Sequence, residues 1–121
     1  MTINPKSIRP FIGARHFERS RLFYQTLGFE EDRLSANLSV FKSGEFGFYL
    51  QDAYVKDWID NSMVFMEVAD VAQFWDDLLA LDLPAKFENV RQVPIRKFDW
   101  GSECYLHDPA GILWHFGEFA K

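Results

Sequence analysis

Cysteine and long apolar runs are nearly absent from this chain of 121 residues. The single cysteine, Cys104, allows no disulfide within the chain, and such cysteine usage fits the reducing cytoplasm. The N-terminal segment MTINPKSIRP holds no apolar run of signal-peptide length, and no stretch approaches the length of a membrane span. We therefore expect a soluble, cytoplasmic protein with no membrane partner.

Positive charge is also in short supply. Thirteen Lys and Arg residues stand against 18 Asp and Glu residues, which gives a net charge of −5. Nucleic-acid binding is disfavoured because no basic patch is available to displace counterions from phosphates. The sequence contains no phosphate-binding P-loop, no glycine-rich dinucleotide fingerprint and no Ser-His-Asp arrangement, so those enzyme classes are disfavoured too.

Aromatic residues are abundant instead. They make up 17% of the chain, with 13 Phe and 4 Trp. A small core can use rings to fill its volume, and aromatic side chains also dominate the lining of ligand pockets. We expect both uses, by different rings.

The secondary-structure pattern occurs twice. Each half reads as strand, helix and three strands, so we expect a single α+β domain over residues 1–121, built from two βαβββ modules. Module 1 spans about 7–52, a linker helix about 53–61, and module 2 about 62–119. The predicted strands lie at about 8–14, 30–34, 38–43, 46–51, 63–68, 86–93, 103–107 and 112–116, with the main helices at about 17–26 and 70–81.

Helical spacing predicts the buried faces of the two main helices. In the first helix these positions are Leu22, Phe23 and Leu27, and Gly28 ends the helix. In the second helix Asp70 is the expected N-cap. Its predicted buried stripe is Val71, Phe74, Trp75, Leu78 and Leu79.

The stretch Phe98–Gly117, FDWGSECYLHDPAGILWHFG, holds a tight turn between two strands. Pro109 fixes its own φ, the Asp108 side chain can bond to backbone amides further on, and Gly111 supplies the dihedrals needed to leave the turn.

The pattern WG-x-E-x-x-L-x-DPAG-x-x-x-HF in this stretch resembles the glyoxalase / bleomycin resistance / dioxygenase superfamily, whose fold is called vicinal oxygen chelate. It is closest in kind to the metal-free, bleomycin-resistance-like branch. The segments PFIGARHF, FY-x-x-LGF and MVFMEVADV, at residues 10–17, 23–29 and 63–71, agree with it in order and spacing. The resemblance runs from about Ile8 to Phe119.

This resemblance implies an architecture and a site. Two βαβββ modules would form a curved, partly open, barrel-like sheet with a cleft, and two chains would pair into a homodimer. Metal-dependent members take their ligands from strand positions that correspond here to Arg9, Tyr49, Met63 and His115. A permanent cation, a thioether and a single imidazole do not make a divalent metal site, so we expect no metal, no cofactor and none of the metal-dependent reactions.

Strand alternation separates the residues that face the cleft from those that pack under the helices. Aliphatic sets such as Ile8, Pro10 and Ile12 belong under the helices, and Cys104 is expected to be buried with Leu106. The predicted ligand-binding residues are Arg9, Phe11, Tyr49, Met63, Phe65, Glu67, Trp100, Glu103, Tyr105 and His115.

We expect a metal-free protein that sequesters an aromatic or cationic small molecule, with no catalytic residues. The glutamates at 67 and 103 would select a cationic group, and Arg9 an anionic or carbonyl group. One alternative is a metal-independent isomerase or lyase with His115 or Glu67 as general base, although the sequence shows no partner that would orient His115. Another is a structural dimer whose cleft is filled by its own rings.

Overall fold

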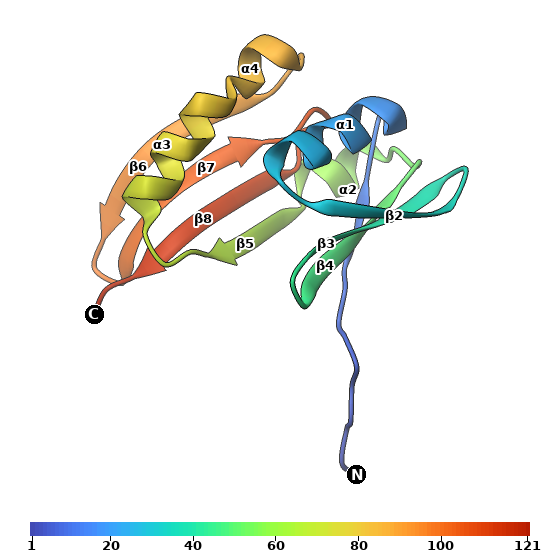
Figure 1. The fold of residues 1–121 in the computed structure, drawn as a ribbon, viewed down its shortest axis with the longest axis horizontal. Helices are drawn as coiled ribbons and strands as arrows, with labels where there is room; N and C mark the ends of the chain where they lie inside the picture. Colours follow the sequence, from blue (N-terminus) through green and yellow to red (C-terminus); the bar gives the residue numbers. More distant parts are fainter.

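The structure, a computed structural model, describes residues 1–121. It contains two four-stranded sheets, in the strand orders β1-β4-β3-β2 and β5-β8-β7-β6, with helices beside them (Figure 1). In each sheet the first strand runs parallel to the last strand of its module, and the other pairs are antiparallel. The predicted α+β class with two βαβββ modules is confirmed, and the two sheets do not close into a barrel within one chain.

The observed elements follow the predicted order. Module 1 contains β1 (Phe11–Gly13), α1 (Phe17–Leu27), β2 (Glu30–Ser35), β3 (Leu38–Ser43) and β4 (Phe46–Gln51). The linker helix is α2 (Lys56–Asp60). Module 2 contains β5 (Met63–Glu67), α3 (Val71–Leu81), α4 (Leu83–Lys86), β6 (Arg91–Phe98), β7 (Gly101–His107) and β8 (Leu113–Phe119). The longest helices have 11 residues, and none is long and apolar enough to cross a membrane.

The strand predicted at about 86–93 is wrong in its first half. Asp82 takes a left-handed conformation with φ of 53°, which ends α3 and lets the short helix α4 follow immediately. Strand β6 therefore begins at Arg91 and runs to Phe98, through an irregularity in its pairing between Val93 and Arg96. Pro94 lies in this irregular part, where the absence of an N–H group does least damage to the ladder.

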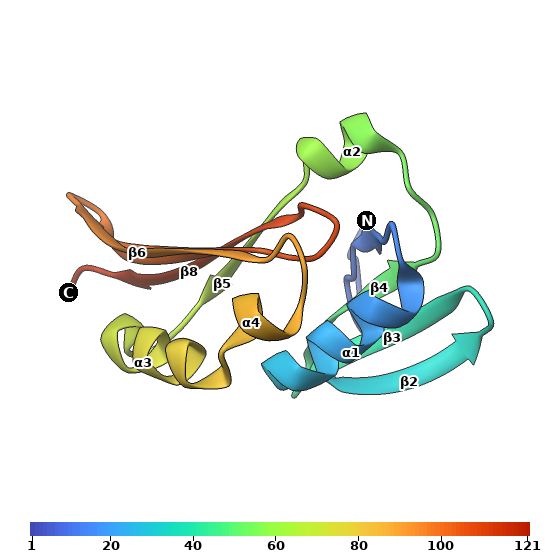
Figure 2. The same cartoon turned by 90° about the horizontal axis from the view of Figure 1, so that it is seen from above.

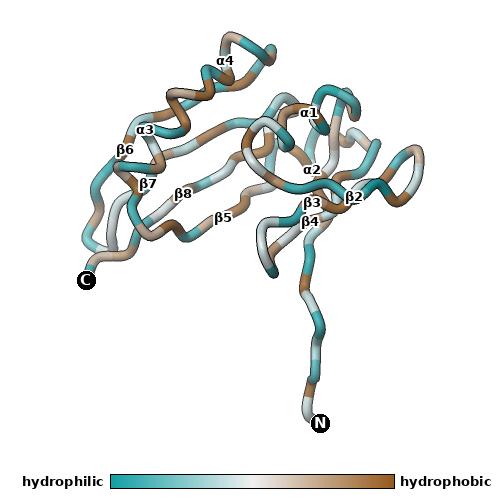
Figure 3. The backbone as a smooth tube through the Cα atoms, viewed as in Figure 1, coloured by the Kyte–Doolittle hydropathy of each residue, from teal (hydrophilic) through white to brown (hydrophobic).

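The helix faces are largely as predicted, with one exception in each helix. Leu22 is 56% exposed and Leu79 is 48% exposed, so neither belongs to the buried stripe. Asp70 caps α3 as expected, because its side chain accepts a hydrogen bond from the Gln73 N–H at 3.0 Å. Figure 3 shows hydrophobic and hydrophilic positions alternating along α3, as an amphipathic helix requires.

The first strand is shorter than the predicted range of about 8–14. Strand β1 is only three residues long, and the preceding segment runs away from the body of the protein as an extended arm (Figure 1). Ile8 and Pro10, which we expected to pack under the helices, are both exposed, Ile8 by 86%.

The helix-bearing sides of both sheets share one hydrophobic core. Figure 2 shows α3 and α4 along one side of the second sheet and α1 beside the first. The Trp114 ring of β8 packs against Phe48 of module 1, with ring centroids 5.5 Å apart, and against Phe29 at 5.8 Å. The two modules are thus joined through their helix-bearing sides, and the opposite faces of the sheets are left for other uses.

A buried group of hydrogen bonds crosses the junction between the modules. The Tyr24 hydroxyl of α1 donates to Asp108 Oδ2 at 2.6 Å, and the Trp114 indole N–H donates to the Tyr24 oxygen at 3.0 Å. Asp108 Oδ1 accepts the backbone N–H groups of Ala110, Gly111 and Ile112, each at 2.9 Å. Burial raises the pKa of Asp108, whereas the hydrogen bonds that its carboxyl group accepts from Tyr24 and from the three backbone N–H groups lower it. The turn expected from Asp108 is confirmed. The second carboxyl oxygen of Asp108, Oδ2, connects the two modules because it accepts the hydrogen bond from Tyr24.

We predict that Tyr24→Phe destabilises the fold by about 2 kcal/mol, because it leaves Asp108 Oδ2 and the Trp114 N–H unpaired inside the core. The measurement is urea unfolding followed by circular dichroism. The matched control is Tyr54→Phe at a 39% exposed tyrosine, which should change stability by less than about 0.5 kcal/mol. Equal effects of the two substitutions would contradict a role for the Tyr24 hydroxyl.

Candidate functional site

Corresponding strands of the two modules carry corresponding side chains on the face away from the helices. Phe11 of β1 is paired in register with Tyr49 of β4, and Phe65 of β5 is paired in register with His115 of β8. The neighbouring residues on the other face, such as Leu50 and Trp114, are buried in the core. The burial pattern confirms the predicted alternation in β5 and β8 and in most of β4, but Phe46, at the start of β4 on the same face as Phe48 and Leu50, is 81% exposed.

On the first sheet, this face forms a small group of three residues. The Phe11 and Tyr49 rings stack with centroids 4.8 Å apart, and the Arg9 guanidinium lies 6.0 Å from the centre of the Tyr49 ring. The Arg9 Nε atom is buried but has no hydrogen-bond partner. A fixed cation next to two rings can bind an anionic or carbonyl group beside an aromatic system.

On the second sheet, four exposed rings form what we call the aromatic cluster: Phe65, Phe98, Trp100 and Phe119. Trp100 stacks on Phe98 with centroids 5.7 Å apart and lies 5.5 Å from Phe119 and 6.0 Å from Phe65. The four side chains are between 39% and 51% exposed. Rings that contact each other yet remain this exposed offer a surface on which a further ring can stack.

Sequence reasoning missed two members of this cluster, Phe98 and Phe119. Phe119 continues the alternation of His115 and Gly117, and it was overlooked because the last strand was expected to end at Phe116. Phe98 was overlooked because its segment was read as a loop, whereas it ends strand β6 beside Gly101.

A polar group lies next to the aromatic cluster. Glu103 is only 7% exposed, and both of its carboxylate oxygens lie 3.2 Å from His115 Nδ1. A carboxylate only accepts hydrogen bonds, so this contact favours the tautomer in which the Nδ1–H group donates a hydrogen bond to Glu103. The other ring nitrogen, Nε2, lies 3.4 Å from the sulfur of Met63, which is itself 67% exposed. Glu103 is thus the orienting partner of His115 that the sequence did not show.

Tyr105 completes this polar group. Its ring meets the His115 ring edge to face, with centroids 5.1 Å apart. Burial, and then the neighbouring Glu103, raise the pKa of the Tyr105 hydroxyl to about 12, so that it stays protonated at neutral pH. The Arg96 guanidinium lies 5.8 Å from the centre of the same ring.

The ten predicted site residues fall into two groups. Met63, Phe65, Glu67, Trp100, Glu103, Tyr105 and His115 share the exposed face of the second sheet, whereas Arg9, Phe11 and Tyr49 share that of the first. A groove of about 900 Å³ lies between the β3–β4 hairpin and β5, and Phe65, Glu67 and Phe119 line it. Neither Tyr49 nor His115 lines this groove.

The side chains at the superfamily's metal positions do not fit a metal ion. The residues there are Arg9, Tyr49, Met63 and His115, which supply a permanent cation, one phenol, one thioether and one imidazole. No group of three or more His, Cys, Asp or Glu side chains is arranged to hold a metal ion. This donor set gives no basis for a step that uses a metal.

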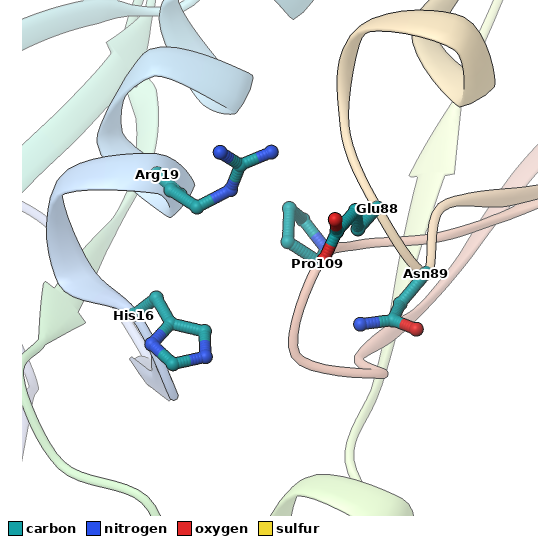
Figure 4. A pocket seen from close by; sticks show the side chains of 5 residues that line it. All are labelled: His16, Arg19, Glu88, Asn89 and Pro109. Atoms are coloured by element: carbon teal, nitrogen blue, oxygen red, sulfur yellow. The ribbon is translucent and has the colours of Figure 1, made fainter.

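The other reactive side chains lie elsewhere. Cys104 is fully buried, as expected, and burial raises the pKa of its thiol to about 11, so it is not a reactive thiolate. A polar pocket of about 160 Å³ separates the N-terminal end of α1 from the β7–β8 turn (Figure 4). His16 and Arg19 face Glu88 and Asn89 across it, and it contains none of the predicted site residues.

Comparisons with known proteins identify the fold. A bleomycin-binding protein complexed with bleomycin matches with a TM-score of 0.78 at 18% identity, over 96% of this chain and 100% of that chain. A bleomycin-binding protein from Streptomyces verticillus, complexed with copper(II)-bleomycin, matches with a TM-score of 0.75 at 20% identity, over 98% and 100% of the chains. Lactoylglutathione lyase from Agrobacterium tumefaciens matches with a TM-score of 0.71 at 20% identity, over 94% of each chain.

The chain therefore has the fold of bleomycin-binding proteins and of lactoylglutathione lyase, as the sequence motifs indicated. No protein-family model matches the sequence, and no curated protein does. Because the fold is shared by binding proteins and by a lyase, it does not by itself decide the function of this chain.

We predict that Gly117→Ala displaces the Phe65 ring without unfolding the protein. A Cβ atom at Gly117 would lie 2.5 Å from Phe65 Cζ, and this exposed ring can swing away from the sheet. The measurement is the set of NMR cross-peaks between Phe65 and Trp100, which should weaken or vanish. Ser43→Ala, at an exposed strand end, is the control, and unchanged cross-peaks in Gly117→Ala would contradict the contact.

Proposed function

We propose that this chain is a metal-free small-molecule binding protein that takes up an aromatic ligand carrying a cationic group. The observation that carries the proposal is the aromatic cluster on the second sheet. A monomeric protein gains stability by burying such rings, so four adjacent rings left 39–51% exposed favour a binding surface.

Stacking explains why the ligand would be aromatic. A planar ring system placed against Trp100 or Phe65 would bury apolar surface on both partners, and each such aromatic pair adds about 0.5–1.5 kcal/mol beyond the burial. Gly117 supports this arrangement because it lets Phe65 lie close over β8.

Charge explains why the ligand would carry a cationic group. Glu67 is exposed on the same face as Phe65, and the chain as a whole has a net charge of −5. Both features attract a cation, and the rings themselves favour a cation over their faces. Bleomycin is a suitable first probe, because two of the structures that this fold resembles hold it.

We predict saturable quenching of tryptophan fluorescence when bleomycin is titrated into the protein, with a stoichiometry near one ligand per chain. Trp100→Phe should weaken binding about tenfold, because phenylalanine offers a smaller surface for stacking. Trp75→Phe, in the partly buried helix α3, is the control for loss of a fluorophore. The absence of quenching at micromolar bleomycin would contradict bleomycin binding. It would favour the alternative of a structural dimer whose cleft is filled by its own rings.

We also propose that the protein is a homodimer and that the ligand cleft is completed by the second copy. The outer edge of the first sheet, β2, carries Glu30, Glu31, Asp32 and Arg33, charged residues that discourage edge pairing. The inner edge strand β5 instead has the sequence MVFME, with Met63 and Phe65 exposed. Exposed apolar side chains on an edge strand favour contact with another chain. Phe11 on β1, which is 59% exposed, adds to this apolar surface.

We predict a mass of two chains, each of 14.2 kDa, in sedimentation equilibrium at micromolar concentration. Phe11→Glu should shift the equilibrium to the monomer, because it puts a charge into the proposed interface without disturbing the core. Leu34→Glu, at an exposed apolar position on the charged edge strand β2, is the control and should leave the dimer intact. A wild-type protein that stays monomeric would contradict both the dimer and the cleft shared between two chains, and would leave the aromatic cluster of one chain as the proposed binding surface.

A further inference from the structure

The pairing of His115 with Glu103 has the geometry of a general base and the residue that orients it. Glu103 is nearly buried, and its two oxygens lie at the same distance, 3.2 Å, from His115 Nδ1. This contact fixes the ring orientation and keeps the proton on Nδ1. The lone pair of the neutral imidazole is then on Nε2, the nitrogen directed away from Glu103.

The position of Nε2 makes it available to a ligand. Its only neighbour among hydrogen-bonding side chains is the Met63 sulfur at 3.4 Å, a weak acceptor that cannot donate a proton to it. Met63 is 67% exposed and unbranched, so it can move aside for a ligand. No stronger partner competes for the lone pair.

Neighbouring rings would hold a substrate at this nitrogen. The Phe65 ring lies 6.4 Å from the His115 ring at an interplanar angle of 29°, and the Tyr105 ring meets it edge on. His115 therefore lies beside the Phe65 ring, on which a planar ligand can stack. The charged groups around the pair are Glu103 on β7, Arg96 on β6 and Glu67 on β5.

We propose that this chain catalyses proton abstraction from a planar aromatic carbon acid, with His115 Nε2 as the general base and Glu103 as its positioning residue. This activity goes beyond the binding function proposed above. It needs no metal and no cofactor: His115 takes the proton, the C–H bond electrons stay with the substrate, and the protonated imidazole later releases its proton to water.

The test uses 5-nitrobenzisoxazole, a planar probe that requires only a base. His115 Nε2 takes the hydrogen on C3, the electrons of that C–H bond complete a nitrile, and the ring N–O bond breaks to give 2-cyano-4-nitrophenolate. The phenolate is followed by its absorbance. We expect the protein to exceed the same concentration of free imidazole by about 10²-fold.

The variants separate the base from its surroundings. His115→Ala should remove the rate above background, and imidazole added to the solution should restore part of it. Glu103→Gln keeps the shape of the side chain but leaves only one oxygen to accept the hydrogen bond from His115 Nδ1, so it should lower the rate about tenfold. Glu103→Asp should have a rate between those of Glu103→Gln and the wild type. His16→Gln, at an exposed histidine on the N-terminal side of α1, is the control and should have the wild-type rate.

The outcomes remain distinct from those of ligand binding. A rate no greater than that of free imidazole, or a rate that survives His115→Ala, would overturn the proposal even if bleomycin still binds. Loss of the rate in Glu67→Gln with His115→Ala unaffected would assign the base to Glu67 and overturn it as well. Restoration by imidazole, together with a reduced rate in Glu103→Gln, would support it, because a purely structural role for His115 predicts neither.

Discussion

The hydrogen bonds among Tyr24, Asp108 and Trp114 determine how the two modules are oriented. They are fully buried, they connect helix α1 of module 1 to the turn and last strand of module 2, and they draw the helix-bearing sides of both sheets into a single core. A buried carboxyl group requires partners wherever it lies, so the modules cannot slide without leaving Asp108 unsatisfied. The consequence is that the opposite faces of the two sheets point outward, with their rings exposed.

This orientation gives each module a separate role. The first sheet contributes Arg9 and a stacked pair of rings, and the second contributes the aromatic cluster and the Glu103–His115 pair. The exposed face of the second sheet brings together rings, a carboxylate and an oriented imidazole. The chemistry is therefore concentrated in module 2, although the two modules have the same topology.

This fold is shared by bleomycin-binding proteins and by a lyase, so the side chains and not the fold decide the function. At the four positions that the sequence resemblance associates with metal ligands, this chain has an arginine, a tyrosine, a methionine and a histidine. The His115 imidazole has one nitrogen, Nε2, that does not contact Glu103 and lies next to the thioether sulfur of Met63. Such a nitrogen can accept a proton or contact a ligand, and its buried carboxylate partner fixes which of the two nitrogens is free.

The sequence by itself determined the order of the strands, the two main helices, the turn at Asp108 and the faces on which most side chains lie, because these depend on local periodicity and turn chemistry. Phe11, Tyr49, Phe65 and His115 were assigned to the exposed faces by alternation alone, and the register agrees. Periodicity failed at the margins of the buried helix faces, where Leu22 and Leu79 lie outside the core, and at strand ends, where β8 extends to Phe119 and Ile8 lies on the arm. Only the tertiary structure brought Glu103 to His115 and Phe98 and Phe119 to Trp100. Those contacts join side chains from different strands, and their distances depend on the register of the whole sheet, which no local pattern encodes.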